Sequence, residues 1–271
     1  MVAHSNFDDL LAGEGPVVRV AVAETRGSAP RERDALMIVG PAAVAGTIGG
    51  GRLEQIAVER AGVMLEGGPA EDVLVVPLGP EIGQCCGGAV TLRLQRIDEA
   101  ERAALRAEIE AQRQARPHVY VFGAGHVGRA LARCLLLLPV QTILIDGRPD
   151  ELSAAAPQVE RRLMAMPEAA LATAPAGSAV VIATHDHALD FLIAADALAA
   201  RRFAYVGMIG SKTKRALFRR SLADREVGDG ALVCPIGGGT VRDKRPEIIA
   251  ALTAAEISAR LFGQDRARSD L

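Results

Sequence analysis

The stretch Val119-Tyr120-Val121-Phe122-Gly123-Ala124-Gly125-His126-Val127-Gly128 decides the fold of the second half of this chain. Residues 119–122 are apolar, β-branched or aromatic, which is typical of a buried strand. The three glycines have Gly-x-Gly-x-x-Gly spacing and open a predicted helix at residues 127–138. In such a turn Gly123 permits the tight bend, Gly125 lets a phosphate approach the backbone, and Gly128 lets the helix pack on the sheet.

The chain beyond this turn alternates between predicted strands and helices. Asp146 ends the next predicted strand, where an acid meets a ribose hydroxyl in dinucleotide-binding proteins. Such alternation favours a parallel sheet with helices on both faces, a Rossmann-type α/β domain. The predicted strands are 142–146, 159–163, 180–183, 204–209 and 231–235, and the predicted helices are 188–200, 213–222 and 246–261.

The first part of the chain predicts a smaller α+β domain. Apolar, β-branched runs indicate strands at 16–24, 36–39, 73–76 and 89–94. A glycine-rich turn at 46–51 opens a helix that ends at Gly67. We therefore expect an N-terminal α+β domain at 1–97, a helical linker at 98–117 that Pro117 stops, and the Rossmann-type domain at 118–271.

Composition excludes several classes of function. The 271 residues are 49% hydrophobic, carry a net charge of -2 and include only 3% aromatic residues, which disfavours nucleic-acid binding. No apolar run reaches the roughly 18 residues that a membrane span needs, and the N-terminus has no signal-peptide core. The four cysteines are expected to be thiols in a reducing compartment. A cytoplasmic protein is the expectation.

The segment Gly83-Gln84-Cys85-Cys86-Gly87-Gly88 contains the most unusual chemistry. Glycines on both sides bring the backbone close to whatever the thiols contact. Thiolates are soft ligands and nucleophiles, so one interpretation is a thiol that binds a soft metal or carries sulfur. The other is one buried and one incidental cysteine. The Cys-x-x-Cys spacing of zinc sites is absent.

Three further segments have both a ligand-binding and a structural interpretation. The turn at 46–51, with the segment 27–31, could offer backbone N–H groups to an anion or could be turn chemistry alone. His185 follows a strong predicted strand, where ligands bind in this fold, but the next residue, Asp186, could equally be a helix N-cap. Lys212 opens a basic helix that suits an anion or is merely solvated. Its segment is not a Walker A loop, because the glycine-to-lysine spacing is wrong.

Taken together, these segments resemble the xanthine dehydrogenase accessory proteins of bacteria, the XdhC/CoxI family. The matching stretches follow the family's order over nearly the whole chain, although Ser28-Ala29-Pro30-Arg31 replaces the usual Ser-Thr-Pro-Arg and residues 237–247 match more loosely. They are 27–31, 46–54, 83–88, 121–128, 183–187 and 205–215.

The resemblance implies an accessory protein without turnover of its own. Such proteins bind the molybdenum cofactor, in its molybdopterin form or as the dinucleotide, and support exchange of an oxo for a sulfido ligand with a cysteine desulfurase. They then help to insert the cofactor into the molybdenum subunit of xanthine dehydrogenase. A homodimer is compatible with the sequence, and no catalytic residue is assigned.

The implied cofactor site combines the thiol segment with the Rossmann-type domain. Cys85 or Cys86 would contact molybdenum or shield its sulfido ligand, with Cys85 ranked slightly ahead. The alternative function is an NAD-dependent oxidoreductase, because Asp146 suits the ribose of NAD, but the double-cysteine segment would then be unexplained. The predicted cofactor-binding residues are Gln84, Cys85, Cys86, Gly123, Gly125, Gly128, Asp146, His185 and Lys212.

Overall fold

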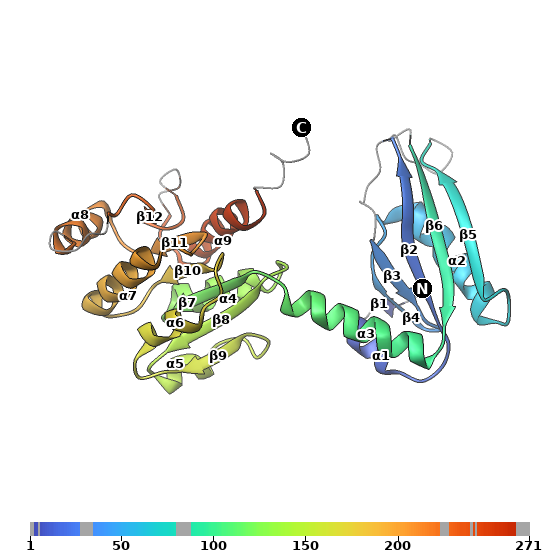
Figure 1. Ribbon diagram of the computed structural model, residues 1–271, viewed down its shortest axis with the longest axis horizontal. Coiled ribbons are helices and arrows are strands. Elements are labelled where there is room, and N and C mark those ends of the chain that lie inside the picture. The colour runs from blue at the N-terminus through green and yellow to red at the C-terminus, as the bar shows by residue number, and fades with distance from the viewer. Residues whose placement is uncertain are drawn as a thin grey trace. The chain divides into compact units, whose positions relative to one another are not determined.

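The chain divides into two compact units, Met1–Ala111 and Gln112–Leu271. The structure is a computed structural model that describes residues 3–4, 6–27, 35–79, 88–222, 228–238, 241 and 243–263. The predicted site residues Gln84, Cys85 and Cys86 lie outside the described residues, as do residues 28–31. The first unit is an α+β fold and the second is a Rossmann-type α/β fold, as the sequence predicts (Figure 1).

The first unit contains a six-stranded mixed sheet in the order β1-β4-β3-β2-β6-β5. Its neighbouring strands are antiparallel, except that β1 and β4 are parallel. The strands are β1 (Ala3–His4), β2 (Val17–Arg26), β3 (Leu36–Val39), β4 (Ala43–Gly46), β5 (Glu71–Pro77) and β6 (Ala89–Ile97), and the helices are α1 (Phe7–Ala12), α2 (Gly51–Leu65) and α3 (Glu99–Gln114).

Helix α2 closes the main core of this unit. Its apolar residues recur at helical spacing and are fully buried against one face of the sheet. The opposite face carries a smaller cluster with residues of α1 and α3, such as Leu11 and Leu105. The sheet residues of the two clusters alternate along the strands, for example Val18 with Val17, because successive side chains in a strand point to opposite faces. The buried residues of α2 are Leu53, Ala57, Ala61 and Met64.

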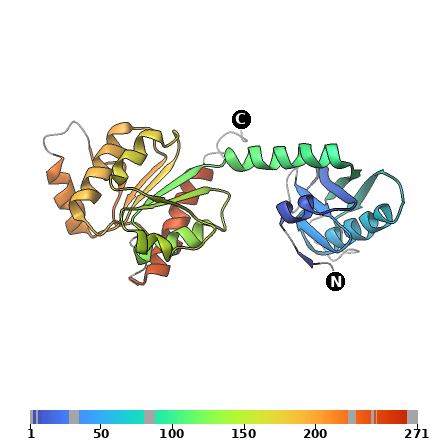
Figure 2. The same ribbon diagram turned by 90° about the horizontal axis from the view of Figure 1, so that it is seen from below.

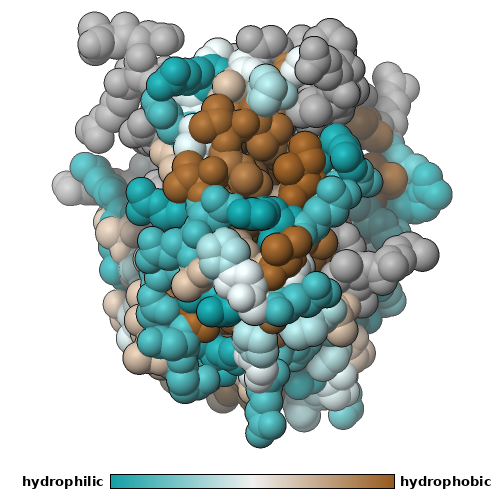
Figure 3. All heavy atoms as spheres, turned by 90° about the vertical axis from the view of Figure 1, so that its right-hand side faces the viewer, coloured by the Kyte–Doolittle hydropathy of each residue, from teal (hydrophilic) through white to brown (hydrophobic). Residues whose placement is uncertain are grey.

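Strand β5 leaves apolar side chains in contact with solvent. Val73 and Val75 are 58% and 68% exposed and alternate with Leu74 and Val76, which join the core under α2. Within the described part of the chain, β5 pairs only with β6. Figure 3 views the molecule from this side and shows apolar side chains gathered in one patch. This unit therefore presents an apolar surface beside a sheet edge.

The second unit contains a six-stranded, wholly parallel sheet in the order β12-β11-β10-β7-β8-β9. The strand order reverses between β7 and β10, and ligands bind at this switch point in doubly wound folds. The strands are β7 (His118–Phe122), β8 (Gln141–Asp146), β9 (Glu160–Leu163), β10 (Ala179–Ile182), β11 (Tyr205–Met208) and β12 (Leu232–Val233). The helices are α4 (His126–Leu135), α5 (Pro149–Ser153), η2 (Pro167–Ala169, a 3₁₀ turn), α6 (Ala170–Thr173), α7 (His187–Ala200), α8 (Lys212–Ser221) and α9 (Pro246–Phe262).

Helices cover both faces of this sheet (Figure 2). On one face Phe122 and Ile182 share a core with residues of α7 and α8, including Ile193 and Phe218. On the other face, Val121 and Val181 share a core with residues of α4 and α9. Both faces are therefore buried, which explains the continuous apolar runs that predicted these strands.

Short elements are the main difference from the sequence-based expectation. Helix α1, strand β4, helices α5 and α6 and the η2 turn were not predicted, because they span six residues or fewer and show too little periodicity. Among the residues that the structure describes, no helix combines the length and apolarity needed to cross a membrane.

Candidate functional site

The glycine turn after β7 contains two glycines that packing requires and one that faces open space. Gly123 has φ +107°, and an ideal Cβ there would lie 2.2 Å from the Ala183 carbonyl oxygen. A Cβ on Gly128 would lie 1.8 Å from the Gly123 carbonyl oxygen. By contrast, no described atom lies within 4 Å of an ideal Cβ on Gly125. Gly123 and Gly128 therefore maintain the fold, whereas Gly125 leaves room for a ligand.

Helix α4 begins at this open space. Gly125 is its N-cap residue, and no side chain in the described part of the chain caps it. Two other helices of the same unit are capped, α7 by Asp186 and α8 by Ser211. The first N–H groups of a helix lack intrahelical partners and carry partial positive charge, so the start of α4 can accept an anion.

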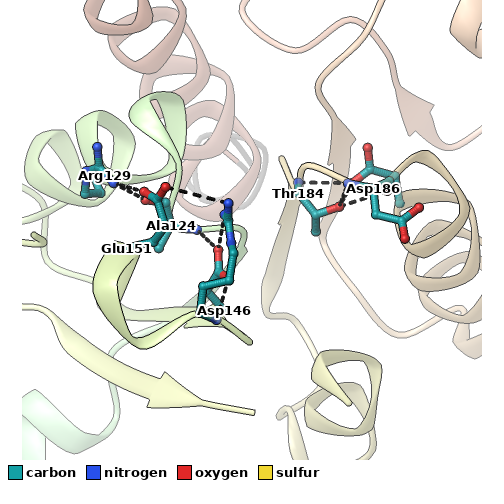
Figure 4. Close-up of polar contacts among 8 residues, drawn as sticks. Ala124, Arg129, Asp146, Glu151, Thr184 and Asp186 are labelled. Carbon is teal, nitrogen blue, oxygen red and sulfur yellow. Dashed lines mark hydrogen bonds and ion pairs between the residues drawn. The ribbon is translucent and has the colours of Figure 1, made fainter. Parts of the chain in front are cut away.

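Asp146, at the end of β8, is fully engaged by protein donors (Figure 4). Its Oδ1 accepts from the Arg148 backbone N–H (2.9 Å) and from Arg148 Nε (3.0 Å). Its Oδ2 accepts from the Ala124 N–H (2.7 Å) and from Arg148 Nη2 (2.9 Å). Burial alone would raise the pKa of Asp146, but these hydrogen bonds outweigh it and lower the pKa to about 2.

Two neighbouring side chains brace the same turn (Figure 4). Arg129 of α4 donates to the Ala124 carbonyl oxygen (2.7 Å) and forms an ion pair with Glu151 of α5. Arg148 Nη1 lies 3.6 Å from Glu151 Oε1. Sequence reasoning identified Asp146 but missed these arginines, although Arg148 follows Asp146 by only two residues. The turn is thus held in a fixed shape before any ligand arrives.

The loop after β10 adjoins this turn and is held by a buried carboxylate. Asp190 of α7 has 0% exposure, and its Oδ1 accepts from the backbone N–H (3.0 Å) and from Oγ1 (2.6 Å) of Thr184. Its Oδ2 forms an ion pair with Lys214 of α8. The neighbouring Asp186 accepts from the Ala188 N–H (2.7 Å), so it is the N-cap that the sequence left as one alternative.

A pocket of about 830 Å³ opens at the carboxyl ends of β10, β11 and β12. Its walls combine apolar, glycine and basic residues. The predicted site residue His185 lines it, whereas Lys212 is the exposed first residue of α8 and does not. Lys214 contributes the lysine of α8 instead. The residues that define its chemistry are Thr184, His185, Ile209, Lys214, Ile236 and Lys244.

Metal-binding chemistry is sparse in the described ranges. They contain no group of three or more His, Cys, Asp or Glu side chains suited to hold a metal ion. Cys134 is half-buried in α4, and Cys234 is buried, with a pKa that burial raises. A raised pKa disfavours the thiolate form that binds metals.

The glycine-rich turn of the first unit already contains an anionic partner. Glu54, in the first turn of α2, accepts at Oε1 from the Ile48 N–H (3.1 Å), the Gly50 N–H (2.9 Å) and the Thr47 hydroxyl. Burial alone would raise the pKa of Glu54, but these hydrogen bonds outweigh it and lower the pKa. The structural interpretation of this turn therefore accounts for the N–H groups of Ile48 and Gly50 without an external anion, although the start of α2 has no side-chain cap in the described part of the chain.

The parallel sheet, its strand order and the glycine turn define a protein with a Rossmann-type domain. More specifically, the chain belongs to the XdhC and CoxI family. Residues 10–76 match the sequence model of the XdhC and CoxI family, and residues 119–257 match the sequence model of the XdhC Rossmann domain. The family resemblance expected from the sequence is confirmed.

One curated protein and one solved structure are similar to this chain. The uncharacterized protein YqeB of Escherichia coli (strain K12) is 25% identical over 258 residues, which cover 89% of this chain but only 43% of YqeB. This chain thus spans less than half the length of that relative. A crystal structure described as a xanthine dehydrogenase from Bacillus halodurans matches with a TM-score of 0.81 and 19% identity, covering 98% of each chain, and shows the same fold.

Proposed function

We propose that this protein binds the molybdenum cofactor as cargo, supports its sulfuration and helps to insert it into xanthine dehydrogenase. Membership of the XdhC and CoxI family supports a role in the maturation of that enzyme. The structural observation on which the proposal depends is the uncapped start of α4 beside Gly125, with a large pocket next to it.

The phosphate end of the cargo fits the start of α4. A pterin dithiolene cofactor ends in a phosphate, or in a pyrophosphate when it carries a nucleotide. The N–H groups of α4 and the open space at Gly125 suit such an anion, and Arg129 and Arg148 add positive charge nearby. Asp146 and Glu151 neutralise most of that charge, so the helix terminus supplies the main attraction.

The alternative of an NAD-dependent oxidoreductase is weakened by Asp146. A carboxylate has about four acceptor positions, and Asp146 accepts four hydrogen bonds from Ala124 and Arg148. A ribose 2′-hydroxyl would have to displace one of them. Titration with NADH, followed by its fluorescence, separates the two functions, since tight binding with turnover would favour the oxidoreductase.

Cys85 and Cys86 supply the sulfur chemistry in this proposal. Both cysteines lie outside the described residues, and their segment of the sequence is what supports this role. One thiol would contact molybdenum or shield the sulfido ligand, with sulfur delivered by a cysteine desulfurase. The Cys85→Ala and Cys86→Ala variants should retain less molybdenum. Unchanged retention in both would refute the role of the thiols.

Purification of the full chain from a host that makes the cofactor tests the central claim. We expect molybdenum, measured by mass spectrometry, and pterin, measured by fluorescence after oxidation, to copurify with the chain in a fixed ratio. A host unable to make molybdopterin is the control and should give neither. Absence of both from the first preparation would contradict cofactor binding.

A co-expression experiment tests the role in maturation. Xanthine dehydrogenase subunits produced with this chain and a cysteine desulfurase should contain more sulfurated cofactor and more activity than subunits produced without the chain. Cyanide releases the terminal sulfur as thiocyanate, which gives a direct assay of sulfuration. Equal thiocyanate in both preparations would contradict an accessory role.

A further inference from the structure

We propose that the pocket at the carboxyl ends of β10, β11 and β12 binds the flat pterin ring of the cargo. Lys214 and Lys244 of the pocket would face anionic groups of the cargo. This inference rests on the proposed function and deepens it, because it assigns the ring to a second subsite beside the phosphate site. The pocket volume of about 830 Å³ lies in the range typical of small-molecule sites.

The wall of the pocket lies against the first glycine of the turn. An ideal Cβ on Gly123 would lie 2.8 Å from the backbone nitrogen of Thr184, and Thr184 is part of the pocket wall. Gly123, the first glycine of the turn, therefore lies against the wall of the pocket at the switch point of the sheet. A single ligand can place a phosphate near Gly125 and its ring system in the pocket.

The apolar wall suits a flat ring. Ile209 follows β11, Ile236 follows β12, and Ile249 belongs to α9, so three separate elements supply branched aliphatic side chains. Gly210 and Gly237 also line the pocket and present backbone without side chains. A heteroaromatic ring can pack on such a surface while its edge atoms reach backbone polar groups.

The basic residues give the pocket its preference for anions. The Lys214 side chain is 11% exposed and is held by Asp190, which uses one of its three ammonium donors and leaves two. Lys244 is exposed, and no ion-pair partner for it lies within the described ranges. The acidic Asp243 at the rim pairs with Arg245 (2.7 Å). Lys244 is therefore the main uncompensated positive charge of the wall.

Charge reversal at two basic residues provides a matched test in the full chain. Lys244→Glu and Arg220→Glu make the same change in net charge, but only Lys244 lines the pocket, whereas Arg220 is an exposed residue near the end of α8. The probe is pterin-6-carboxylate, a flat fluorescent pterin with one anionic group. We expect saturable binding to the native chain and to Arg220→Glu, and about tenfold weaker binding to Lys244→Glu. Equal affinity for the two variants would overturn the assignment, provided that their urea unfolding midpoints match.

Competition identifies which ring the pocket prefers. Neither NADH nor NADPH should displace pterin-6-carboxylate at equal concentration, and inorganic phosphate should leave it bound, because phosphate belongs to the neighbouring subsite. Displacement by NADH that depends on Lys244 would overturn the pterin assignment and indicate a nicotinamide ring.

Cofactor retention separates this inference from the proposed function. The native chain and Arg220→Glu should retain molybdenum and pterin during purification, and Lys244→Glu should lose most of both. If all three chains retain the cofactor equally, the pterin subsite is wrong and cofactor binding stands. If the native chain retains none but binds pterin-6-carboxylate through Lys244, the proposed function is wrong and the pterin-binding pocket stands.

Discussion

The glycine-rich turns before α2 and α4 both leave the helix without a side-chain cap in the described part of the chain, and they differ in how many N–H groups of the turn a carboxylate already binds. In the turn before α2, Glu54 of the same helix accepts the N–H groups of Ile48 and Gly50. In the turn before α4, Asp146 accepts the N–H of Ala124, and no described side chain caps the helix. Glycine spacing therefore does not predict an anion site by itself, because a nearby carboxylate can already occupy it.

The largest effect on this comparison is expected from Gly128→Ala. The new methyl group would lie 1.8 Å from the Gly123 carbonyl oxygen, so the start of α4 must move away from β7. We expect the second unit to lose more than about 4 kcal/mol of stability. Hydrogen exchange in peptides from β7 and α4 measures the loss. Gly125→Ala is the control and should change stability by less than about 1 kcal/mol, and near-native exchange in Gly128→Ala would contradict the packing argument.

Asp146→Asn is expected to have the next largest effect. In the native chain the pKa of Asp146 falls from 3.8 to about 2 on folding, and this shift corresponds to about 2 kcal/mol of folding free energy. Because the folded-state pKa is depressed, this stability is present above about pH 4 and is lost as pH falls toward 2. The variant should be less stable at pH 7 and should show a flatter acid dependence in urea unfolding.

The matched control for that experiment is Asp150→Asn, which removes an exposed carboxylate from α5. It should leave stability at pH 7 nearly unchanged. If the two variants had the same acid dependence, Asp146 would not be the group that braces the turn.

Glu54→Ala should free two N–H groups of the first glycine-rich turn that a carboxylate now binds. Removing the carboxylate leaves the N–H groups of Ile48 and Gly50 without their acceptor, at a cost of about 1–2 kcal/mol in the first unit. Sulfate should then stabilise the variant more than it stabilises the native chain, as thermal unfolding would show. Glu59→Ala is the control, because Glu59 is 66% exposed and forms an ion pair with Arg52 at the surface. An equal response to sulfate in both variants would disprove the occupancy by Glu54.

Gly125→Asp is the converse change and has the smallest expected effect on stability. Gly125 has φ -64° and ψ -175°, which suit an N-cap aspartate. We expect a gain of about 0.5 kcal/mol, together with loss of cofactor retention, because the new carboxylate takes the place of the phosphate. Thermal unfolding and molybdenum content measure the two results. Full retention of cofactor in this variant would place the phosphate elsewhere.

The sequence predicted the long elements of both units because burial repeats along them. Strands with both faces covered, such as β7 and β10, are continuous apolar runs, and β3 has the same limits in the sequence and in the structure. Helix α1 and strand β4 were missed because they contain six and four residues, too few for a periodic pattern.

The candidate site was less predictable because long-range pairing decides it. The sequence favoured Lys212, yet Lys214 reaches the pocket because Asp190, 24 residues earlier, pairs with it. No local pattern contains that pairing. The hydrogen bonds from the first glycine-rich turn to Glu54 were easier to predict from the sequence. A glutamate within the first turn of a helix is a recognised partner for the N–H groups that precede it.

The three glycines of the second turn also imply two different evolutionary constraints. Gly123 and Gly128 have no space for a side chain, so a library of variants selected only for folding should keep both unchanged. Gly125 has space, and the same selection should let it diversify. If selection for cofactor delivery also keeps Gly125 unchanged, a comparison of the two libraries separates the glycines required for folding from the glycine required for cofactor binding.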